Sequence, residues 1–425
     1  MTQQKQRVAM VGLGYIGLPT AALMASKGLE VVGVDINPNT VEILNQGKVH
    51  IVEPDLDELV NQVVKDGSLR ATVTPEEADV FVVAVPTPFT DGFKPDLSYI
   101  KSACESIAPV LKEGNLVILE STSPIGATEK MSDWLSELRP DLNVAGQKGV
   151  DIENVSLNLA HCPERVLPGK VLEELVSNDR VIGGITEICS LRAAEFYSQF
   201  VKGTCVITNS RTAEMAKLTE NSFRDVNIAF ANELSMICEK FDINVWELIK
   251  LANRHPRVNI LQPGCGVGGH CIAVDPWFIV DSAPELTKVI HAARLVNDGK
   301  PHWVVQQVDK LVTDYLLENP GKGIKDVKIA CYGLAFKPNI DDLRESPALE
   351  IAEKLGAKYS GQVSVVEPHI QELPERSSLS KHLAELVSAD AAADADVKVI
   401  LVAHDSFKAD ESISGKYTIN VAWPE

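Results

Sequence analysis

A glycine-rich segment ends in a cysteine whose thiol could act as a nucleophile. Residues 264–271 read GCGVGGHC and follow a loop that contains Pro263. The segment lacks the Lys-Ser or Lys-Thr pair of a phosphate-binding loop. Its glycines leave the backbone close to a ligand and keep Cys271 accessible. Because the thiolate is the nucleophilic form of cysteine, covalent chemistry at Cys271 would need cationic groups nearby.

Two other interpretations of this segment stay open. A zinc site could use Cys265, His270 and Cys271, but adjacent residues rarely both point at one metal and no fourth ligand is evident. We therefore expect no metal. A structural role is common for cysteines, and it suits best those without flanking glycines: Cys104, Cys189, Cys238 and Cys331.

A second group of polar residues is Lys217, Asn221 and Arg224, spaced by four and three. This spacing places them on one face of a helix. They could form a solvated stripe. However, the neighbours of Lys217 are largely apolar, which favours a cleft, where lysine and asparagine side chains could donate to an oxyanion or position a water.

A third group predicts a dinucleotide site. Gly12, Gly14 and Gly17 follow a short apolar run, and Asp35 ends the next apolar run, 18 residues after Gly17. Such glycines provide a tight turn, backbone approach to a pyrophosphate, and close helix packing, and the pyrophosphate sits on the helix N-terminus. A carboxylate at Asp35 would accept hydrogen bonds from ribose and repel a 2′-phosphate, so we expect NAD rather than NADP. A plain glycine turn is the alternative.

The elements that must position these residues indicate an α/β fold. Strand-like runs at residues 7–11, 30–34, 80–85 and 116–120 are separated by helical stretches, as in a doubly wound sheet. Residues 327–332, 363–366 and 397–402 predict a second α/β unit. We therefore expect two Rossmann-like doubly wound domains joined by a long central helix and a helical middle domain.

A long helix is predicted over residues 208–241, with Asn209 or Ser210 as its N-cap, and a second helical stretch over 288–317. The first is long enough to join domains and to pair with a partner subunit, so we expect a homodimer. The expected domains are residues 1–207, which bind NAD; 208–320, helical and dimerising with the cysteine loop; and 321–425, a second Rossmann-like domain.

Composition limits the partners. The net charge of −19 argues against nucleic acid and anionic membranes. The apolar runs are too short to span a bilayer. Eight cysteines without a CxxC pair or a recognisable signal peptide indicate reduced thiols, so we expect a cytoplasmic protein.

Together these motifs resemble the UDP-glucose/GDP-mannose dehydrogenase family over essentially the whole chain. The resemblance rests on the glycine loop with Asp35 and on residues 85–88, 120–122, 162–165, 217 with 221, 268–271 with 275, 336–337 and 344–346. Residues 50–55, 217–233, 253–260 and 273–278 are closer to the branch that acts on UDP-N-acetyl-D-mannosamine. Val274, where many relatives have lysine, fits that branch, whereas the tail 417–423 lacks the acidic-then-basic ending of many relatives.

The resemblance implies a four-electron oxidation of the C6 hydroxyl of a nucleotide sugar to a carboxylate, with two NAD reduced. Cys271 would trap the aldehyde as a thiohemiacetal, and a thioester would follow. Lys217 would exchange the hydroxyl proton or stabilise the oxyanion, Asn221 and Asp275 would order a water, and Glu164 would be the base for hydrolysis.

Binding residues are implied in the same way, and the resemblance assigns UDP binding to the domain of residues 321–425. Thr122 would lie between nicotinamide and substrate, and the cofactor residues would be Gly12, Gly14, Tyr15, Ile16, Gly17, Asp35, Pro86, Thr87, Thr122 and Arg344. The substrate residues would be Arg165, Val166, Lys217, Asn221, Arg224, His255, Arg257, Gly268, Phe336 and Lys337.

Four hypotheses remain. The first is oxidation of UDP-N-acetyl-D-mannosamine, and the second is the same chemistry on UDP-glucose, UDP-N-acetylglucosamine or another nucleotide sugar. The third is an inactive NAD-binding regulator, which the presence of Cys271, Lys217 and Asp275 disfavours. The fourth is a two-electron hydroxyacid dehydrogenase, which would need no thiol.

Overall fold

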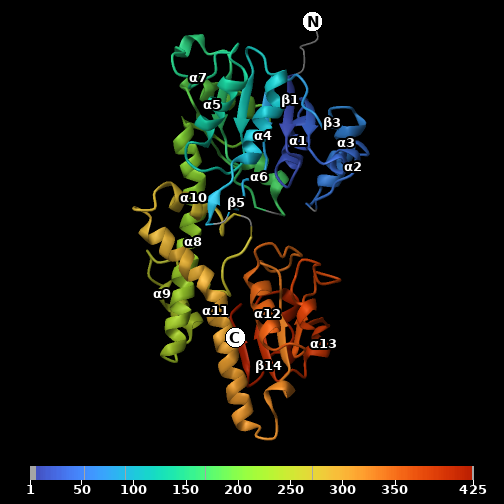
Figure 1. Ribbon diagram of the computed structural model, residues 1–425, viewed down its shortest axis with the longest axis vertical. Helices are drawn as coiled ribbons and strands as arrows, with labels where there is room; N and C mark the ends of the chain where they lie inside the picture. The colour runs from blue at the N-terminus through green and yellow to red at the C-terminus, as the bar shows by residue number, and fades with distance from the viewer. Residues whose placement is uncertain (1–5, 52, 91, 168, 270, 424–425) are drawn as a thin grey trace. The chain divides into compact units, whose positions relative to one another are not determined.

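The computed structural model describes residues 6–51, 53–90, 92–167, 169–269 and 271–423 (Figure 1). Its internal contacts divide the chain into two units, Met1–Glu220 and Asn221–Glu425. The division falls inside the long helix α8 (Ser210–Lys240), which therefore contributes residues to both units. Each unit has its own sheet and its own core.

The first unit is built on an eight-stranded sheet with the order β10-β9-β8-β7-β4-β1-β2-β3. Neighbouring strands are parallel except β8 and β9, which are antiparallel. The order 3-2-1-4-5-6 of a dinucleotide-binding fold is present from β3 to β8, with two further strands beyond it. The strands are β1 (Arg7–Val11), β2 (Glu30–Val34), β3 (Leu69–Thr72), β4 (Val80–Val83), β7 (Leu116–Leu119), β8 (Asn158–His161), β9 (Arg180–Gly184) and β10 (Cys205–Asn209).

Helices cover both faces of this sheet, so its strands consist of almost unbroken apolar runs. On β1, Val8 and Met10 belong to one buried cluster and Ala9 and Val11 to another on the opposite face. The covering helices are α1 (Gly17–Ser26), α2 (Pro38–Asn45), α3 (Leu56–Lys65), α4 (Ser98–Ile107), α5 (Ala127–Leu138), α6 (Val171–Ser177) and α7 (Glu187–Tyr197), and a small hairpin joins β5 (Phe89–Thr90) to β6 (Lys94–Pro95).

The second unit has a five-stranded, fully parallel sheet with the order β13-β12-β11-β14-β15. This is the 3-2-1-4-5 order of the same fold class. The strands are β11 (Ile329–Tyr332), β12 (Val363–Val366), β13 (Glu385–Leu386), β14 (Val397–Ile400) and β15 (Thr418–Asn420). Its helices are α9 (Val245–Ala252), α10 (Asp275–Ser282), α11 (Lys288–Glu318), α12 (Pro347–Lys358), α13 (Ala389–Ala392) and α14 (Asp405–Lys408).

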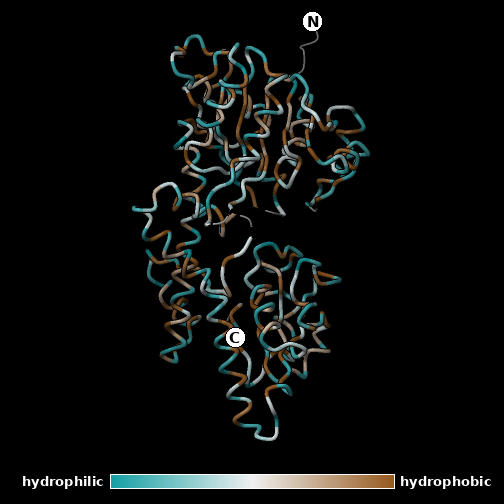
Figure 2. The backbone as a smooth tube through the Cα atoms, in the orientation of Figure 1, coloured by the Kyte–Doolittle hydropathy of each residue, from teal (hydrophilic) through white to brown (hydrophobic). Residues whose placement is uncertain are grey.

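The core of the second unit forms between helix α11 and the sheet. Val304, Val308 and Val312 of α11 lie in one buried cluster with Ile329 and Cys331 of β11. Figure 2 shows hydrophobic stretches, in brown, alternating with hydrophilic ones through both units. None of the described helices is long and apolar enough to cross a membrane.

The α/β architecture, with one mostly parallel and one fully parallel sheet, confirms the predicted fold class. Strands β1, β2 and β12 have the expected bounds, and α11 is one residue longer than expected. The long helix begins at Ser210 rather than 208, because Thr208 and Asn209 are the last residues of β10. Asn209 does cap it, since its Oδ1 accepts a hydrogen bond from the Thr212 N–H at 2.9 Å.

Candidate functional site

The glycine loop after β1 needs glycine at its first and last positions. Gly12 has φ +95°, and a Cβ there would lie 2.4 Å from the Ala84 carbonyl oxygen. A Cβ on Gly17 would lie 1.9 Å from the Gly12 carbonyl oxygen. A Cβ on Gly14 would meet no described protein atom within 4 Å, so this position is open to a ligand. The loop is therefore closed on the protein side and open where a pyrophosphate would approach helix α1.

Asp35 follows β2 and faces the glycine loop. Its Oδ2 accepts a hydrogen bond from the Leu13 N–H at 3.0 Å, and its Oδ1 accepts one from the Asn37 N–H at 2.9 Å. The residue is half-buried. These bonds fix the carboxylate at the carboxyl end of β2, the position that contacts ribose in dinucleotide-binding folds.

Two further candidates for cofactor contact are joined to each other across neighbouring strands. The Thr87 hydroxyl, after β4, donates to the Thr122 carbonyl oxygen, after β7, at 2.6 Å. Ser121 donates to the Val85 carbonyl oxygen at 2.6 Å. Both segments therefore lie at the carboxyl edge of the sheet, as do the glycine loop and Asp35. Pro86, the residue before Thr87, is exposed, and Tyr15, two residues before the start of α1, is 51% exposed.

Glu164 is a buried carboxyl group that follows β8, 7% exposed. Burial raises its pKa, and the nearby positive charges of Lys217 and Arg180 act in the opposite direction. The N–H groups of Arg165 and Val166 also donate to it. A carboxylate near a lysine can act as a general base. The structure therefore places Glu164 and Lys217 in one electrostatic environment.

Arg165 is held by an acid. Its Nη2 lies 2.6 Å from Glu220 Oε1, its Nε donates to Glu220 Oε2 at 3.1 Å, and its Nη1 donates to the Asp179 carbonyl oxygen at 3.2 Å. Val166 packs at the edge of the core of the first unit. A ligand that binds Arg165 must therefore share the guanidinium with the Glu220 carboxylate.

Sequence reasoning missed a buried charge cluster beside Glu164. Arg180 at the start of β9 is 2% exposed, and its Nη1 lies 3.8 Å from Glu120 Oε1. The Tyr197 hydroxyl donates to the same Glu120 oxygen at 3.3 Å, and the Arg180 guanidinium lies 5.3 Å from the centre of the Tyr197 ring. The pKa of Glu120 is raised to about 7, chiefly by burial and also by the charge of Glu164, while Arg180 acts in the opposite direction. In the sequence, the only signal for this cluster was the charged residue Glu120 directly after an apolar strand.

In the second unit, Asp275 connects the cysteine loop to helix α8. The Asn221 Nδ2 donates to Asp275 Oδ2 at 2.5 Å, and the Asp275 N–H donates to the Cys271 carbonyl oxygen at 2.8 Å. Asp275 is 3% exposed and begins α10, where a carboxylate interacts favourably with the helix dipole. Cys271 is exposed. An accessible thiol therefore lies beside an ordered amide–carboxylate pair.

The glycines before Cys271 pack against another loop of the second unit. A Cβ on Gly268 would lie 2.4 Å from the Glu345 carbonyl oxygen, and one on Gly269, at φ +83°, would lie 2.8 Å from the Phe336 ring. The Gly269 N–H donates to the Arg344 carbonyl oxygen at 3.3 Å. These glycines serve close packing of two loops, a role that the sequence did not predict.

The remaining candidates divide into two groups. Lys337 is exposed, and the Arg344 side chain pairs with Asp342 at 2.6 Å. Arg224, His255 and Arg257 are exposed, and the Arg257 N–H donates to His255 Nδ1 at 3.4 Å. The described contacts do not bring these three to Cys271.

The zinc interpretation finds no support from Cys265. This residue is buried in the hydrophobic core of the second unit, and burial raises the pKa of its thiol to about 12. Cys271 is exposed, and His270 lies outside the described residues.

Comparison with known proteins covers nearly the whole chain. Three sequence models of the UDP-glucose/GDP-mannose dehydrogenase family match: the NAD binding domain at residues 6–201, the central domain at 211–299 and the UDP binding domain at 330–421.

Individual relatives are similarly close. A UDP-N-acetyl-D-mannosamine dehydrogenase of Salmonella typhimurium is 60% identical over 97% of each chain. An NDP-N-acetyl-D-galactosaminuronic acid dehydrogenase of Ralstonia nicotianae is 59% identical over 94% of this chain and 91% of its own. The solved structure of a UDP-D-ManNAc dehydrogenase from Pyrococcus horikoshii has a TM-score of 0.83 and 40% identity, covering 97% of this chain and 93% of its own.

Proposed function

The chain belongs to the UDP-glucose/GDP-mannose dehydrogenase family, and we propose that it oxidises the C6 hydroxyl of UDP-N-acetyl-D-mannosamine to a carboxylate. It is an NAD-dependent enzyme that acts on a UDP-sugar. The observation that carries the proposed chemistry is that Cys271 is exposed and lies beside an ordered polar pair. The Asp275 N–H donates to the Cys271 carbonyl oxygen, and the Asp275 carboxylate accepts a hydrogen bond from the Asn221 side-chain amide. A covalent four-electron oxidation needs such an accessible nucleophile beside groups that can order water.

The cofactor-binding residues fit NAD. Gly12 and Gly17 close the loop against the protein, Gly14 leaves space, and Asp35 presents a carboxylate where the adenosine ribose would lie. Tyr15, Ile16, Pro86, Thr87, Thr122 and Arg344 complete the proposed set. When bound, NAD supplies the acceptor for each of the two hydrides.

The covalent steps take place on Cys271. After the first hydride leaves C6, the thiolate adds to the aldehyde carbon and gives a thiohemiacetal. Loss of a second hydride from the same carbon gives a thioester. Water then adds to the thioester carbonyl, the C–S bond breaks, and the thiol and the carboxylate are released. Two NAD and one water are consumed for each sugar, and the bound thioester cannot diffuse away as a free aldehyde would.

Acid–base roles follow from position and charge. Lys217 takes the C6 hydroxyl proton or stabilises the oxyanion of the intermediate. Asn221 and Asp275 order the water, and Glu164 is the base that deprotonates it. Burial raises the pKa of Glu164. Thr122 lies between nicotinamide and sugar in this proposal.

Substrate contacts are assigned to two loops and one helix. Phe336 and Lys337 of the second unit would meet the uridine diphosphate, with Gly268 beneath Phe336. The remaining residues proposed for the sugar and diphosphate are Arg165, Val166, Lys217, Asn221, Arg224, His255 and Arg257. The cations among them would give an anionic ligand a local positive site on a chain of net charge −19.

The sugar is the finer part of the proposal. The 60% identity to a protein named for UDP-N-acetyl-D-mannosamine supports it, and the 59% identity to a protein named for an N-acetylgalactosaminuronic acid keeps a related acetamido sugar as the alternative. Purified enzyme is to be mixed with UDP-N-acetyl-D-mannosamine, UDP-glucose, UDP-N-acetylglucosamine and UDP-N-acetylgalactosamine while NADH is followed. Two NADH per UDP-N-acetyl-D-mannosamine are expected, and none from that sugar would contradict the proposal.

The thiol requirement is tested by Cys271→Ala. Turnover should vanish while NAD binding, measured by calorimetry, is retained, because Cys271 is not part of the Gly12–Gly17 loop that is proposed to bind NAD. A variant that still produces two NADH per sugar would refute covalent catalysis at this residue.

We also propose a homodimer in a reducing compartment. Phe223, Phe230 and Ile237 of α8 are 68%, 53% and 44% exposed and are spaced by seven residues, so they share one face. All eight cysteines are free, which supports a cytoplasmic location.

A further inference from the structure

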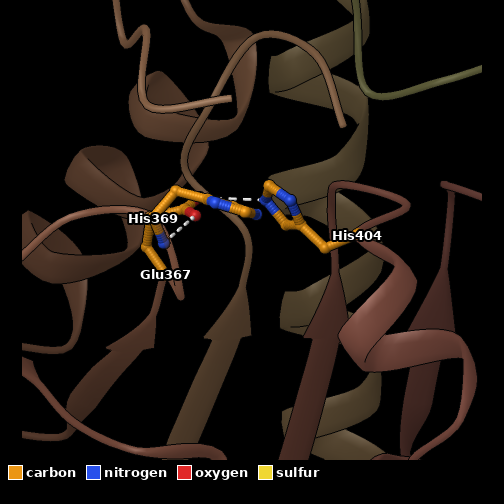
Figure 3. Close-up of side chains that lie close together, drawn as sticks. All are labelled: Glu367, His369 and His404. Carbon is orange, nitrogen blue, oxygen red and sulfur yellow. Dashed lines mark hydrogen bonds and ion pairs between the residues drawn. The ribbon is translucent and has the colours of Figure 1, made fainter. Parts of the chain in front are cut away.

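A buried carboxylate at the end of β12 accepts four hydrogen bonds. Glu367 Oε2 accepts from the N–H groups of Leu334 and Ala335 at 2.8 and 3.1 Å and lies 3.1 Å from His404 Nε2. Its Oε1 accepts from the His369 N–H at 3.1 Å. Figure 3 shows the bonds to His369 and His404. Glu367 is 4% exposed and His404 is fully buried, so these bonds replace water.

His404 holds the same loop at a second point. Its Nδ1 accepts a hydrogen bond from the Asn339 N–H at 3.0 Å. Because a neutral imidazole has one acceptor and one donor nitrogen, Nε2 carries the proton and donates it to Glu367. Asn339 has φ +61°, a conformation that asparagine tolerates, and its side chain also donates to Asp405 at 2.8 Å.

The segment held in this way contains the proposed uridine diphosphate contacts. Glu367 binds the backbone at residues 334 and 335, and His404 binds it at 339, so Phe336 and Lys337 lie between the two attachment points. The Phe336 ring packs against Gly269, two residues before Cys271. A shift of this loop would therefore move both a nucleotide contact and the support of the cysteine loop.

The arrangement differs from the equivalent position of the first unit. Asp35 also follows the second strand of its sheet, but it accepts one hydrogen bond from its glycine loop and stays half-buried. Glu367 is buried and engaged by three backbone N–H groups and an imidazole. The two acids occupy the same position in their sheets. Asp35 is the one proposed to contact ribose, whereas Glu367 holds a loop.

A metal ion is the competing interpretation, since one ligand atom from each of Glu367, His369 and His404 lie within 4.8 Å of one another. A histidine that coordinates through Nε2 needs its proton on Nδ1. Here Nδ1 of His404 is an acceptor, so metal binding would require loss of the Asn339 bond. The hydrogen bonds favour a structural linkage over a metal site.

We propose that Glu367 and His404 are positioning residues for the nucleotide of the substrate: they hold residues 334–339 so that Phe336 and Lys337 present a preformed surface to a nucleoside diphosphate. This inference rests on the proposed role of Phe336 and Lys337. Holding a loop in its bound conformation strengthens binding by reducing the entropy lost on association.

The test separates nucleotide affinity from cofactor affinity. Full-length wild type and the variants His404→Ala, His404→Asn, His404→Gln and Glu367→Gln are to be titrated calorimetrically with UDP and, separately, with NAD. For His404→Ala we expect a Kd for UDP raised at least about tenfold, with the NAD Kd within about twofold, because the attachment at Asn339 is lost and Glu367 loses its imidazole donor. KM for the nucleotide sugar should rise while kcat changes less.

Conservative variants provide the rescue. Asparagine can replace the Nδ1 acceptor and glutamine the Nε2 donor, so each should recover part of the UDP affinity lost in His404→Ala. His369→Ala is the matched control: it keeps the backbone N–H that Glu367 uses, and its UDP affinity should equal that of the wild type. If His404→Ala fails to fold, Glu367→Gln and His404→Gln decide the question.

Several results would overturn the inference. They are unchanged UDP affinity in Glu367→Gln and the His404 variants, a parallel loss of UDP and NAD affinity, or a Zn²⁺-dependent gain of UDP affinity that His369→Ala abolishes. A wild type that binds NAD but not UDP would instead refute the proposed function of the loop, so the two failures are distinguishable.

Discussion

Glu120 lies directly after a strand in a position where water cannot reach it, and Arg180 and Tyr197 are its polar neighbours. Burial raises the pKa of Glu120 from 4.5 to about 7. Between these two pH values the folded protein keeps a proton that the unfolded chain has lost. Because the folded state then binds more protons, the free energy of unfolding must fall as pH rises through this window.

The first prediction is that Glu120→Gln removes this fall. Wild type should lose on the order of 3 kcal/mol of unfolding free energy between about pH 4.5 and 7 through this group. The variant mimics the protonated acid and cannot ionise, so its pH profile should be flatter. Urea denaturation at several pH values measures both slopes. Exposed Glu77→Gln is the control and should keep the wild-type slope; an equally steep slope in Glu120→Gln would contradict the prediction.

At the scale of elements, one acid joins the long helix to the start of α5. Glu214 of α8 is fully buried, and it accepts from the Gly126 N–H at 2.6 Å, the Thr128 N–H at 2.8 Å and the Thr128 hydroxyl at 2.6 Å. These groups include N–H donors that the first turn of α5 cannot satisfy internally. The negative charge also lies at the positive end of the helix dipole.

The second prediction is that Glu214→Gln costs about 2–3 kcal/mol of unfolding free energy, because an amide NH₂ must face N–H donors and the charge is lost. Urea denaturation measures it. Glu129→Gln is the matched control: Glu129 pairs with Arg211 at 2.7 Å across the same two helices, but both are exposed, so its loss should cost less than about 1 kcal/mol. Equal costs for the two variants would rule out the capping role.

The third prediction concerns the glycine loop. Gly17→Ala places a Cβ 1.9 Å from the Gly12 carbonyl oxygen, so it should lower both stability and NAD affinity. Gly14→Ala meets no described protein atom within 4 Å, so its unfolding free energy should stay near that of wild type while the NAD Kd rises about tenfold or more, because the methyl group occupies the approach of the pyrophosphate. Calorimetry with NAD and thermal unfolding separate the two effects. Normal NAD binding by Gly14→Ala would show that the cofactor does not use this opening.

Sequence reasoning succeeded where one segment determines its own structure. Apart from Arg7 and Glu30 at their first positions, the runs 7–11 and 30–34 are apolar on both faces, as is typical of strands covered by helices on both sides, so their bounds could be predicted. The glycine loop and Asp35 belong to one local unit and were found together. The Lys217 and Asn221 face followed from helical spacing alone.

The same reasoning failed where two distant segments must meet. β9 has a buried arginine at its first residue, and β8 contains Asn158 and His161, so neither has the purely apolar composition of a core strand. The packing of Phe336 on Gly269, 67 residues apart in sequence, left no periodic signal. The role of Glu367 could not be predicted, because three of its four donors come from residues 334, 335 and 404, which are distant in sequence.

At the scale of the whole molecule, an exposed apolar face of α8 supports the proposed homodimer. Exposed single apolar residues are ordinary, but a row of three at seven-residue spacing on one helix supports the proposed homodimer contact. Phe223, Phe230 and Ile237 form that row. Two copies related by a twofold axis would bury the row of each against the row of the other.

The fourth prediction is that Phe230→Glu separates the dimer. Wild type should have twice the chain mass of 46.2 kDa, about 92 kDa, by light scattering after size exclusion. A carboxylate at the centre of the row would face its own copy across the axis, desolvated and without a cation, so the variant should elute with the mass of one chain. Leu317→Glu is the control, because Leu317 is 75% exposed but lies at the end of α11, outside the row. A monomeric wild type, or a Phe230→Glu variant that keeps the dimer mass, would place the subunit contact elsewhere or remove it. If the dimer forms as proposed, NAD affinity should survive its separation, because the glycine loop and Asp35 lie wholly within the first unit.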